Sequence, residues 1–178
     1  MTHGGDSLAA FPGSYNPPTV AHLAMAEAAV AQCGVRRVDL VLSRSTIGKE
    51  HVVHPTIDER ADVLRSVAAT RPWLGVVVTD ARLLVDISDG YDVLVLGADK
   101  WEQVLDVAYY GGSVAARDDA VARLPRLAVA RRRDHALPDE DPRAVVLDID
   151  VGHISSTAAR AGQRELILPE AVASGLWD

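Results

Sequence analysis

The stretch FPGSYNPPTVAH, residues 11–22, joins a predicted strand to a predicted helix. Residues 8–11 form a short apolar run that ends at a Pro-Gly pair, which is typical of a buried strand that meets a turn. Residues 20–33 contain many alanines, a leucine and a methionine and no helix breaker, and Gly34 stands where a left-handed helix cap belongs. The first unit is therefore expected to be a strand, a loop and a helix.

The same alternation continues along the chain. Apolar runs predict further strands at residues 38–42, 76–78, 93–96, 127–130 and 144–147. A capping-box pattern from Thr56 to Glu59 opens a helix that runs towards Thr70, and another helix is expected over residues 113–124. This alternation predicts an α/β fold in a single domain over residues 1–178, with a doubly wound parallel sheet that binds ligands at the carboxyl ends of its strands.

Composition restricts the kind of partner. With 178 residues, 48% hydrophobic and 24% charged, the chain has the size and balance of one globular domain. Its net charge of −7 repels long nucleic acids overall, which favours a small metabolite and argues against nucleic-acid binding. The sequence shows no membrane-length apolar stretch or signal-peptide pattern, so we expect a cytoplasmic protein that does not bind membranes. Cys33, the single cysteine, is expected to be a small buried hydrophobe.

Groups suited to an anion gather where the first predicted strand ends. Gly13 lets the backbone approach a phosphate, while Ser14 and Thr19 can donate hydroxyl hydrogen bonds. Thr19 and His22 are three residues apart and share one face of the first helical turn. The alternative is a proline-rich turn that Thr19 caps, followed by an incidental surface histidine.

A second polar motif lies near the C-terminus, at residues 154–160, where Ile-Ser-Ser-Thr-Ala-Ala-Arg begins a predicted helix. Its hydroxyls and helix amides could cradle a pyrophosphate, and Arg160 could supply a charge-assisted clamp. The alternative is an ordinary helix cap by Ser155 or Ser156, with Arg160 in solvent.

Both motifs resemble signatures of the nucleotidylyltransferase superfamily. Residues 13–22 resemble its G-S-F-x-P-P-H/T-x-G-H pattern, and residues 154–160 match its I-S-S-T-x-x-R pattern. The Gly-Ala-Asp of residues 97–99 and the tail at residues 168–172 are most similar to the nicotinate and nicotinamide mononucleotide adenylyltransferases. The resemblance implies a Rossmann-like fold of the adenine nucleotide alpha hydrolase-like type and an adenylyltransferase of NAD biosynthesis.

The resemblance also implies roles for individual residues. Thr19 and His22 are the implied catalytic positions, and Asp99 could accept ribose hydroxyls, although a helix N-cap is its alternative. Ala21 replaces a glycine against which the nucleotide lies in the family, so its methyl group is expected to affect the depth of nucleotide binding. The implied nucleotide-binding residues are Pro12, Gly13, Ser14, Tyr15, Ala21, Gly97, Asp99, Ile154, Ser155, Ser156, Thr157 and Arg160.

Three further residues are candidates for binding the acceptor. Lys49 could reach an acceptor phosphate, and the alternative is a solvated loop lysine. Trp101 could stack on a base, and the alternative is core packing. Arg131, the first of three consecutive arginines, could attract phosphates, and the alternative is protection of a sheet edge.

The reaction that the resemblance implies is transfer of AMP from ATP to a phosphorylated small-molecule acceptor, with release of pyrophosphate. Positioning and charge stabilisation would supply most of the catalysis. No protein metal site is expected, because a Mg²⁺ ion can be held by the nucleotide and water. The preferred acceptor is nicotinate or nicotinamide mononucleotide, although the tryptophan spacing that this branch uses near the pyridine ring is missing and Tyr109 with Tyr110 is a loose substitute.

Several alternatives stay open from the sequence. The acceptor could be phosphopantetheine, or the enzyme could transfer a cytidylyl group. A non-catalytic nucleotide-binding module is favoured by Ala21 alone, and an aminoacyl-tRNA synthetase fragment is disfavoured by the absence of a K-M-S-K-S element. A homo-oligomer is also left open.

Overall fold

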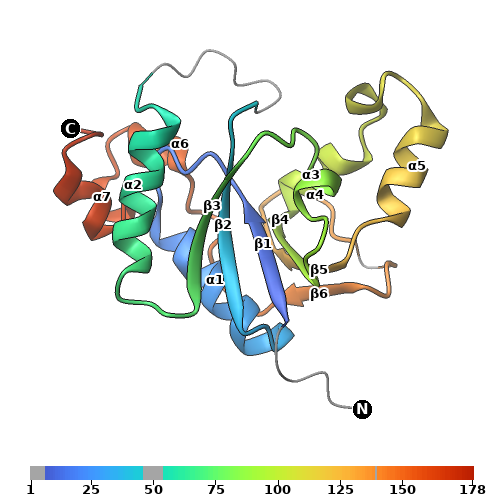
Figure 1. The fold of residues 1–178 in the computed structure, drawn as a ribbon, viewed down its shortest axis with the longest axis horizontal. Helices are drawn as coiled ribbons and strands as arrows, with labels where there is room; N and C mark the ends of the chain where they lie inside the picture. Colours follow the sequence, from blue (N-terminus) through green and yellow to red (C-terminus); the bar gives the residue numbers. More distant parts are fainter. Residues whose placement is uncertain (1–6, 46–53, 139) are drawn as a thin grey trace.

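The computed structural model describes residues 7–45, 54–138 and 140–178, which form a six-stranded sheet with helices on both faces (Figure 1). Neighbouring strands pair in parallel, in the order β3-β2-β1-β4-β5-β6. This arrangement confirms the predicted doubly wound sheet. The strands are β1 (Leu8–Pro12), β2 (Arg37–Ser43), β3 (Leu74–Thr79), β4 (Val93–Gly97), β5 (Arg126–Ala130) and β6 (Ala144–Leu147).

Helices α1 and α2 cover one face of the sheet, while α3, α4 and α5 cover the other (Figure 1). Each face has its own buried cluster, because side chains alternate along a strand: Ala9 and Phe11 belong to the first cluster, and Ala10 to the second. The helical segments are α1 (Val20–Cys33), α2 (Ile57–Ala68), α3 (Leu84–Ile87), α4 (Ala98–Leu105), η1 (Val107–Tyr110), α5 (Val114–Ala122), α6 (Ser156–Arg160), η2 (Arg164–Leu166) and α7 (Pro169–Ser174).

The predicted helix boundaries are reproduced where local chemistry sets them. Helix α1 ends at Gly34, whose φ of 69° is the left-handed conformation expected of a cap. Helix α2 begins with the predicted capping box: the Glu59 carboxylate accepts from the Thr56 amide at 2.7 Å, and the Thr56 hydroxyl accepts from the Glu59 amide at 3.2 Å. Cys33 is buried, as predicted.

Helices α3, α4 and α7 were not predicted as elements. With 4 and 6 residues, α3 and α7 are too short to show a helical repeat of apolar positions, whereas the 8 residues of α4 do carry one, since Ala98, Trp101 and Val104 are buried on one face. The interpretation of Asp99 as an N-cap is wrong, because Gly97 caps α4 and Asp99 lies inside its first turn. Among the described residues, no helix has the length and apolar character needed to span a bilayer.

The strand order creates a crevice beside β1. The chain moves outward from β1 to β2 and β3, then returns to the other side of β1 for β4, β5 and β6. The loops that leave β1 and β4 therefore separate at their carboxyl ends, which is the usual position of ligands in such sheets. Gly13 begins the first of these loops, and α4 follows β4 directly.

Candidate active site

A cavity of about 370 Å³ lies at this crevice. Its walls come from the β1–α1 loop, the first turn of α1, the junction of β4 and α4, and the segment that leads into α6. The structure therefore brings together most of the predicted site residues, which are far apart in the sequence. The predicted residues that line it are Pro12, Gly13, Ser14, Thr19, His22, Gly97, Asp99, Ile154, Ser155, Ser156, Thr157 and Arg160.

His22 is oriented by the capping box that starts α1. The backbone amide of Thr19 and the His22 Nδ1 atom are 2.9 Å apart, and the Thr19 hydroxyl oxygen lies 2.9 Å from the same nitrogen. A backbone amide can only donate, so Nδ1 must accept and the ring proton of a neutral His22 sits on Nε2. The resulting Nε2–H group is a hydrogen-bond donor of the kind a phosphate oxygen requires.

Thr19 positions the His22 ring through its contacts with Nδ1. Its exposed fraction is 0%, and its hydroxyl lies against the imidazole of His22. Thr19 also forms an isolated antiparallel bridge with Ile167, which fixes its backbone from the opposite side. Its geometry therefore suits a residue that holds His22 in place better than one that touches a nucleotide.

Aromatic packing supports the other side of the His22 ring. The centroids of Tyr15 and His22 are 4.9 Å apart, and Phe11 meets Tyr15 edge to face at 5.9 Å. Tyr15 is fully buried and donates its hydroxyl to the Phe11 carbonyl, and burial raises its pKa well above the ordinary value of 10.0. The prediction that the Tyr15 side chain binds nucleotide is therefore corrected: it supports His22 from within the core.

Ala21 also points into the core. Its exposed fraction is 1%, and it belongs to the buried cluster between α1 and the sheet. Because Ala21 lies outside the lining of the cavity, its methyl group occupies no space there. The expectation that this methyl group limits the depth of nucleotide binding does not fit the structure.

The Ser-Ser-Thr segment at the start of α6 caps the helix and also lines the cavity, so the helix-cap and phosphate-binding interpretations are compatible. Ser155 caps α6 by accepting the Ala158 amide at 3.0 Å, and its hydroxyl hydrogen can still be donated to a phosphate. Ser156 gives its hydroxyl hydrogen to the Pro17 carbonyl at 2.8 Å, and Arg160 donates to the Asn16 carbonyl. Ser156 and Arg160 thus hold the β1–α1 loop while they line the cavity.

Charge at the β4 side of the cavity is balanced around Asp99. Its carboxylate oxygens lie 3.7 Å from Arg132 Nε and 3.7 Å from Lys100 Nζ. Arg132 is fixed by donating to the carbonyls of Val151 at 3.0 Å and Ile154 at 2.6 Å. A Cβ atom at Gly97 would stand only 2.5 Å from an oxygen of Asp99, so the missing side chain keeps this wall open.

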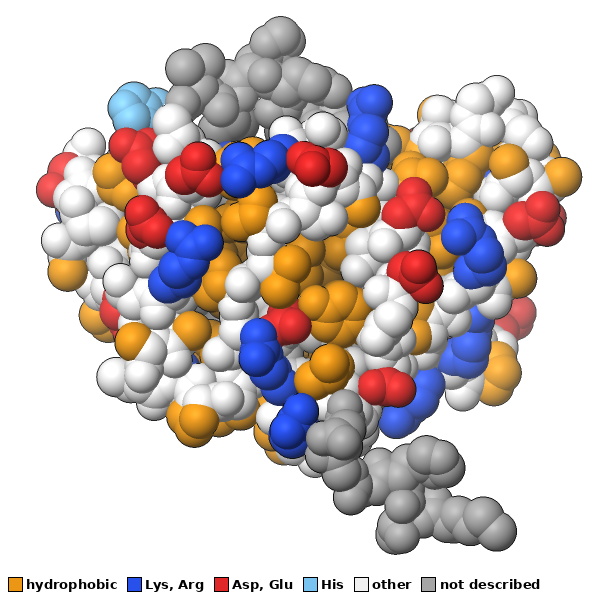
Figure 2. Space-filling model, in the orientation of Figure 1, with side chains coloured by type: hydrophobic (Ala, Val, Ile, Leu, Met, Phe, Trp, Pro, Cys, Tyr) orange, Lys and Arg blue, Asp and Glu red, His pale blue; other side chains and the backbone are white. Residues whose placement is uncertain are grey.

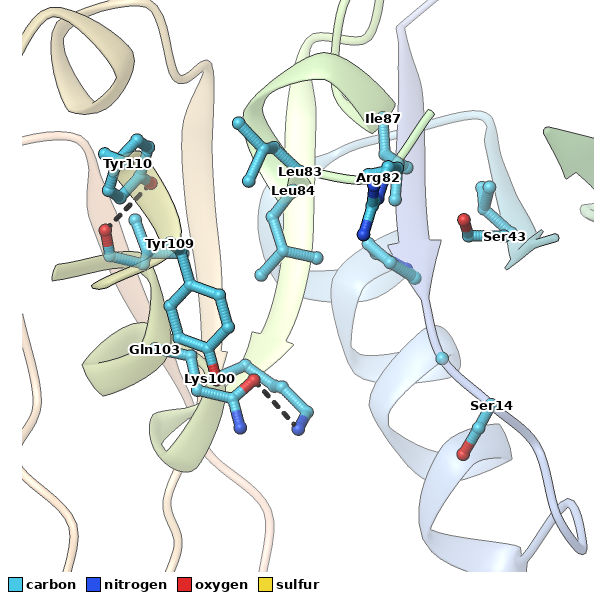
Figure 3. A pocket seen from close by; sticks show the side chains of 14 residues that line it. Ser14, Ser43, Arg82, Leu83, Leu84, Ile87, Lys100, Gln103, Tyr109 and Tyr110 are labelled. Atoms are coloured by element: carbon cyan, nitrogen blue, oxygen red, sulfur yellow. Dashed lines mark hydrogen bonds between the residues drawn. The ribbon is translucent and has the colours of Figure 1, made fainter. Parts of the chain in front are cut away.

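A second cavity of about 120 Å³ adjoins the first and shares Pro12, Gly13, Ser14 and Lys100 with it. In Figure 3 the Tyr109 ring and Ser14 lie on opposite sides of it, with Leu83 and Leu84 above. The described lining includes two cations, Arg82 and Lys100, and no carboxylate. Such a pocket suits a flat apolar group attached to an anion.

The three acceptor candidates fare differently in the structure. Lys49 lies outside the described residues. Trp101 is 7% exposed and packs in the core cluster under α3 and α4, so its alternative interpretation as a core residue fits better. Arg131 is exposed and lines neither cavity, whereas the next two arginines, Arg132 and Arg133, line the first one. The choice of Arg131 within this triplet is therefore corrected.

Several cavity residues were missed because they belong to no motif. Lys100 follows Asp99 directly and lines both cavities. Its place beside the Gly-Ala-Asp motif could have identified it as a site residue. Arg82 follows the carboxyl end of β3, where ligand contacts gather in parallel sheets. Met25 and His135 line the first cavity without a recognisable pattern around them.

Comparison with known proteins identifies a family and similar folds. A family model described as cytidylyltransferase-like matches residues 10–162. The fold is similar to that of the Plasmodium falciparum nicotinic acid mononucleotide adenylyltransferase complexed with APC, with a TM-score of 0.71, 13% identity and 98% of each chain covered. The same enzyme complexed with NaAD gives a TM-score of 0.67 at 12% identity, covering 96% of this chain and 94% of that one. No curated protein matches the chain significantly in sequence.

Proposed function

The chain belongs to the cytidylyltransferase-like family of nucleotidyltransferases, and from this premise we propose that it transfers AMP from ATP to a phosphorylated acceptor and releases pyrophosphate. The preferred acceptor is nicotinate or nicotinamide mononucleotide. One observation carries the proposal: two adjoining cavities share the wall formed by Pro12, Gly13 and Ser14, and His22 lines the larger one. Two substrates can therefore meet at this wall.

The proposed reaction is a direct displacement at the α-phosphorus of ATP. An oxygen of the acceptor phosphate forms a bond to this phosphorus, and the bond to the bridging oxygen of pyrophosphate breaks, so pyrophosphate leaves with that electron pair. His22 donates from Nε2 to a non-bridging oxygen of the α-phosphate, where negative charge must be stabilised as the reaction proceeds. Ser14 and Ser155, which line the same cavity, donate hydroxyl hydrogen bonds to the phosphates.

Magnesium is part of the proposal, and its ligands would come from the nucleotide and water. Among the described residues, no group of three or more His, Cys, Asp and Glu side chains could hold a metal ion. Asp99 is the one described carboxylate that lines the cavity, and Arg132 and Lys100 already neutralise it. We therefore propose that Mg²⁺ is held by phosphate oxygens and water, where it would offset the charge of the triphosphate.

The acceptor would occupy the smaller cavity. Tyr109 offers a ring for stacking a planar group, a contribution of about 0.5–1.5 kcal/mol beyond burial of area. Lys100 and Arg82 offer positive charge to the acceptor phosphate or to a carboxylate. Both structures named above are of a nicotinic acid mononucleotide adenylyltransferase, which supports this choice over phosphopantetheine.

The experiment that tests the proposal is pyrophosphate release with ATP or CTP and a panel of acceptors. The panel contains nicotinate mononucleotide, nicotinamide mononucleotide, phosphopantetheine and simple sugar or polyol phosphates. The highest kcat/KM is expected with ATP and one of the two mononucleotides. A higher value with phosphopantetheine or a sugar phosphate would reject the acceptor, and a preference for CTP would reject the donor.

A further inference from the structure

The loop between β1 and α1, residues 13–19, relies on distant donors for several of its backbone carbonyls. Pro17 and Pro18 have no N–H group, so the turn hydrogen bonds to the carbonyls three residues earlier, at Ser14 and Tyr15, cannot form. Carbonyl groups that leave water need donors from elsewhere, and Pro17 and Pro18 are both buried. The shape of this loop, which carries Ser14 and Thr19, therefore depends on other parts of the chain.

Donors from distant elements hold four of the loop's carbonyls. Three of these donors come from residues 156–168, close to the end of the chain. The fourth is the guanidinium of Arg60 on α2, which is 6% exposed and also donates to the Pro55 carbonyl at 3.1 Å. The four pairs are Arg60 to Ser14, Arg160 to Asn16, Ser156 to Pro17 and the Leu168 amide to Pro18.

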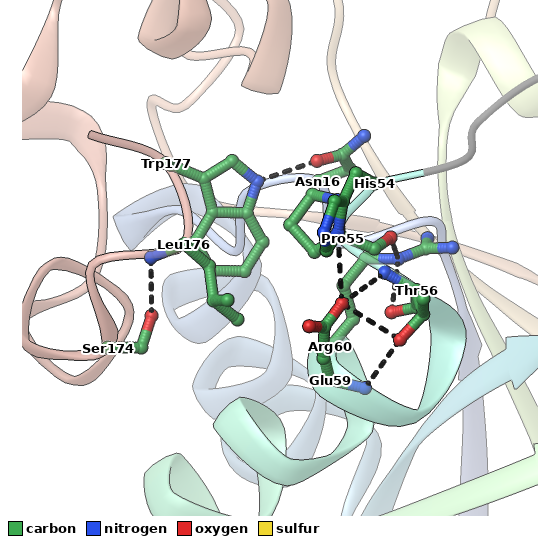
Figure 4. A network of polar contacts seen from close by, with 9 residues as sticks. All are labelled: Asn16, His54, Pro55, Thr56, Glu59, Arg60, Ser174, Leu176 and Trp177. Atoms are coloured by element: carbon green, nitrogen blue, oxygen red, sulfur yellow. Dashed lines mark hydrogen bonds and ion pairs between the residues drawn. The ribbon is translucent and has the colours of Figure 1, made fainter.

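Trp177 adds a side-chain tie to the same loop. Its indole Nε1–H donates to Asn16 Oδ1 at 2.6 Å, as Figure 4 shows. The indole is anchored in turn, because it packs on a small buried cluster that joins α2, α6 and α7 and consists of Val63, Ala159, Ile167 and Ala171. Asn16 lines neither cavity, so this hydrogen bond contacts the loop on the side away from the site.

We propose that Trp177 is a positioning residue of the nucleotide site and acts through Asn16 on the β1–α1 loop. The indole holds Asn16 between Ser14, which faces both cavities, and Thr19, whose amide fixes the His22 ring. Loss of the N–H donor leaves Asn16 Oδ1 without this partner and allows the loop to sample conformations in which these donors are misplaced. The effect on catalysis rests on the proposed function, whereas the effect on the loop does not.

The test compares Trp177→Phe with Trp73→Phe. Both variants keep an aromatic ring and lose an indole N–H, but Trp73 is a half-buried residue just before β3, at the amino end of that strand. With ATP and the best acceptor, Trp177→Phe is expected to lower kcat/KM for ATP about tenfold, the usual cost of one unsatisfied polar group. Hydrogen exchange of the amides in residues 13–19 should quicken in this variant, while Trp73→Phe matches the wild type in both measurements.

Asn16→Ala is a second variant, which removes the acceptor of the same hydrogen bond on the loop side. If the two residues act as one unit, Asn16→Ala combined with Trp177→Phe should be no more impaired than Asn16→Ala alone. Additive losses, or a Trp177→Phe variant that matches Trp73→Phe in exchange and in kinetics, would overturn the proposal. If the wild type releases no pyrophosphate, the proposed function fails, and hydrogen exchange still decides whether Trp177 positions the loop.

Discussion

His22 depends on its neighbours for both its position and its tautomer. The Thr19 amide donates a hydrogen bond to Nδ1 of His22, and the Tyr15 ring packs against the imidazole. We therefore expect nitrogen-15 NMR of the protein, recorded on the neutral form of His22, to show the Nε2–H tautomer. An Nδ1–H tautomer would contradict both the hydrogen bond and the proposed donation to the α-phosphate.

Replacing His22 should separate turnover from binding. His22→Ala is expected to lower kcat by about 10²- to 10³-fold, the usual cost of one donor to charge that develops in the transition state. The dissociation constant for ATP should change by less than about tenfold, since many other donors hold the nucleotide. Equilibrium binding and steady-state kinetics measure the two effects, with His153→Ala as the control because His153 is exposed and lines neither cavity. Near-normal kcat would remove His22 from the mechanism.

The junction of β4 and α4 can be tested through its glycine. A methyl group at Gly97 would stand 2.5 Å from Asp99 Oδ1 and 3.1 Å from Arg132 Nε. The Asp99 carboxylate ends a side chain that can move, whereas Arg132 is held by the carbonyls of Val151 and Ile154. Gly97→Ala should therefore displace the Asp99 carboxylate and weaken ATP binding by about 10- to 100-fold, as expected for loss of the charged hydrogen bond that Asp99 would accept from a ribose hydroxyl. Calorimetric titration with ATP measures the loss, and Asp99→Asn should share most of it. Unchanged ATP affinity in Gly97→Ala would show that this wall is not part of the nucleotide site.

The capping box of α2 should make stability depend on pH in a defined direction. The hydrogen bond from the Thr56 amide, followed by that from the Thr56 hydroxyl, lowers the pKa of Glu59 below its ordinary value of 4.5. A carboxyl group with a lowered folded-state pKa stabilises the fold above its unfolded pKa, and this stabilisation disappears as pH falls through the folded value. The free energy of unfolding of the wild type should thus exceed that of Glu59→Gln at pH 7, with the difference shrinking below about pH 4.5. Urea unfolding at several pH values measures it, and a difference that does not vary with pH would contradict the role of the charge.

Elements were predictable where a few neighbouring residues decide the structure. Gly34, the Thr56 box and the apolar runs of the strands identify α1, α2 and the sheet, because each signal is local. The side-chain directions of Tyr15 and Ala21 were not predictable, because a motif gives their positions and the packing under α1 decides which way they point. The sequence could not show which of Arg131 and Arg132 lines the cavity, because the direction in which the chain leaves β5 decides this.

At the scale of the whole molecule, the surface agrees with a small anionic ligand in a local cavity. Figure 2 shows acidic and basic side chains interspersed around hydrophobic ones on this face, without a concentration of one sign on its described part. With a net charge of −7, attraction to phosphates must come from groups such as Arg132, Arg133 and Lys100 at the cavity itself. The N- and C-terminal parts of the fold lie side by side here, because the β1–α1 loop contacts Ser156 at the start of α6 and Trp177 after α7 (Figure 1).

The central claim is that the two cavities bind ATP and a pyridine mononucleotide for one adenylyl transfer. The most direct measurement incubates the protein with ATP, Mg²⁺ and nicotinate mononucleotide and follows pyrophosphate and the dinucleotide product by mass spectrometry. We expect the two products in equal amounts, with loss of both in His22→Ala. Pyrophosphate without dinucleotide, or no product from either mononucleotide while another phosphorylated acceptor is adenylylated, would contradict the claim.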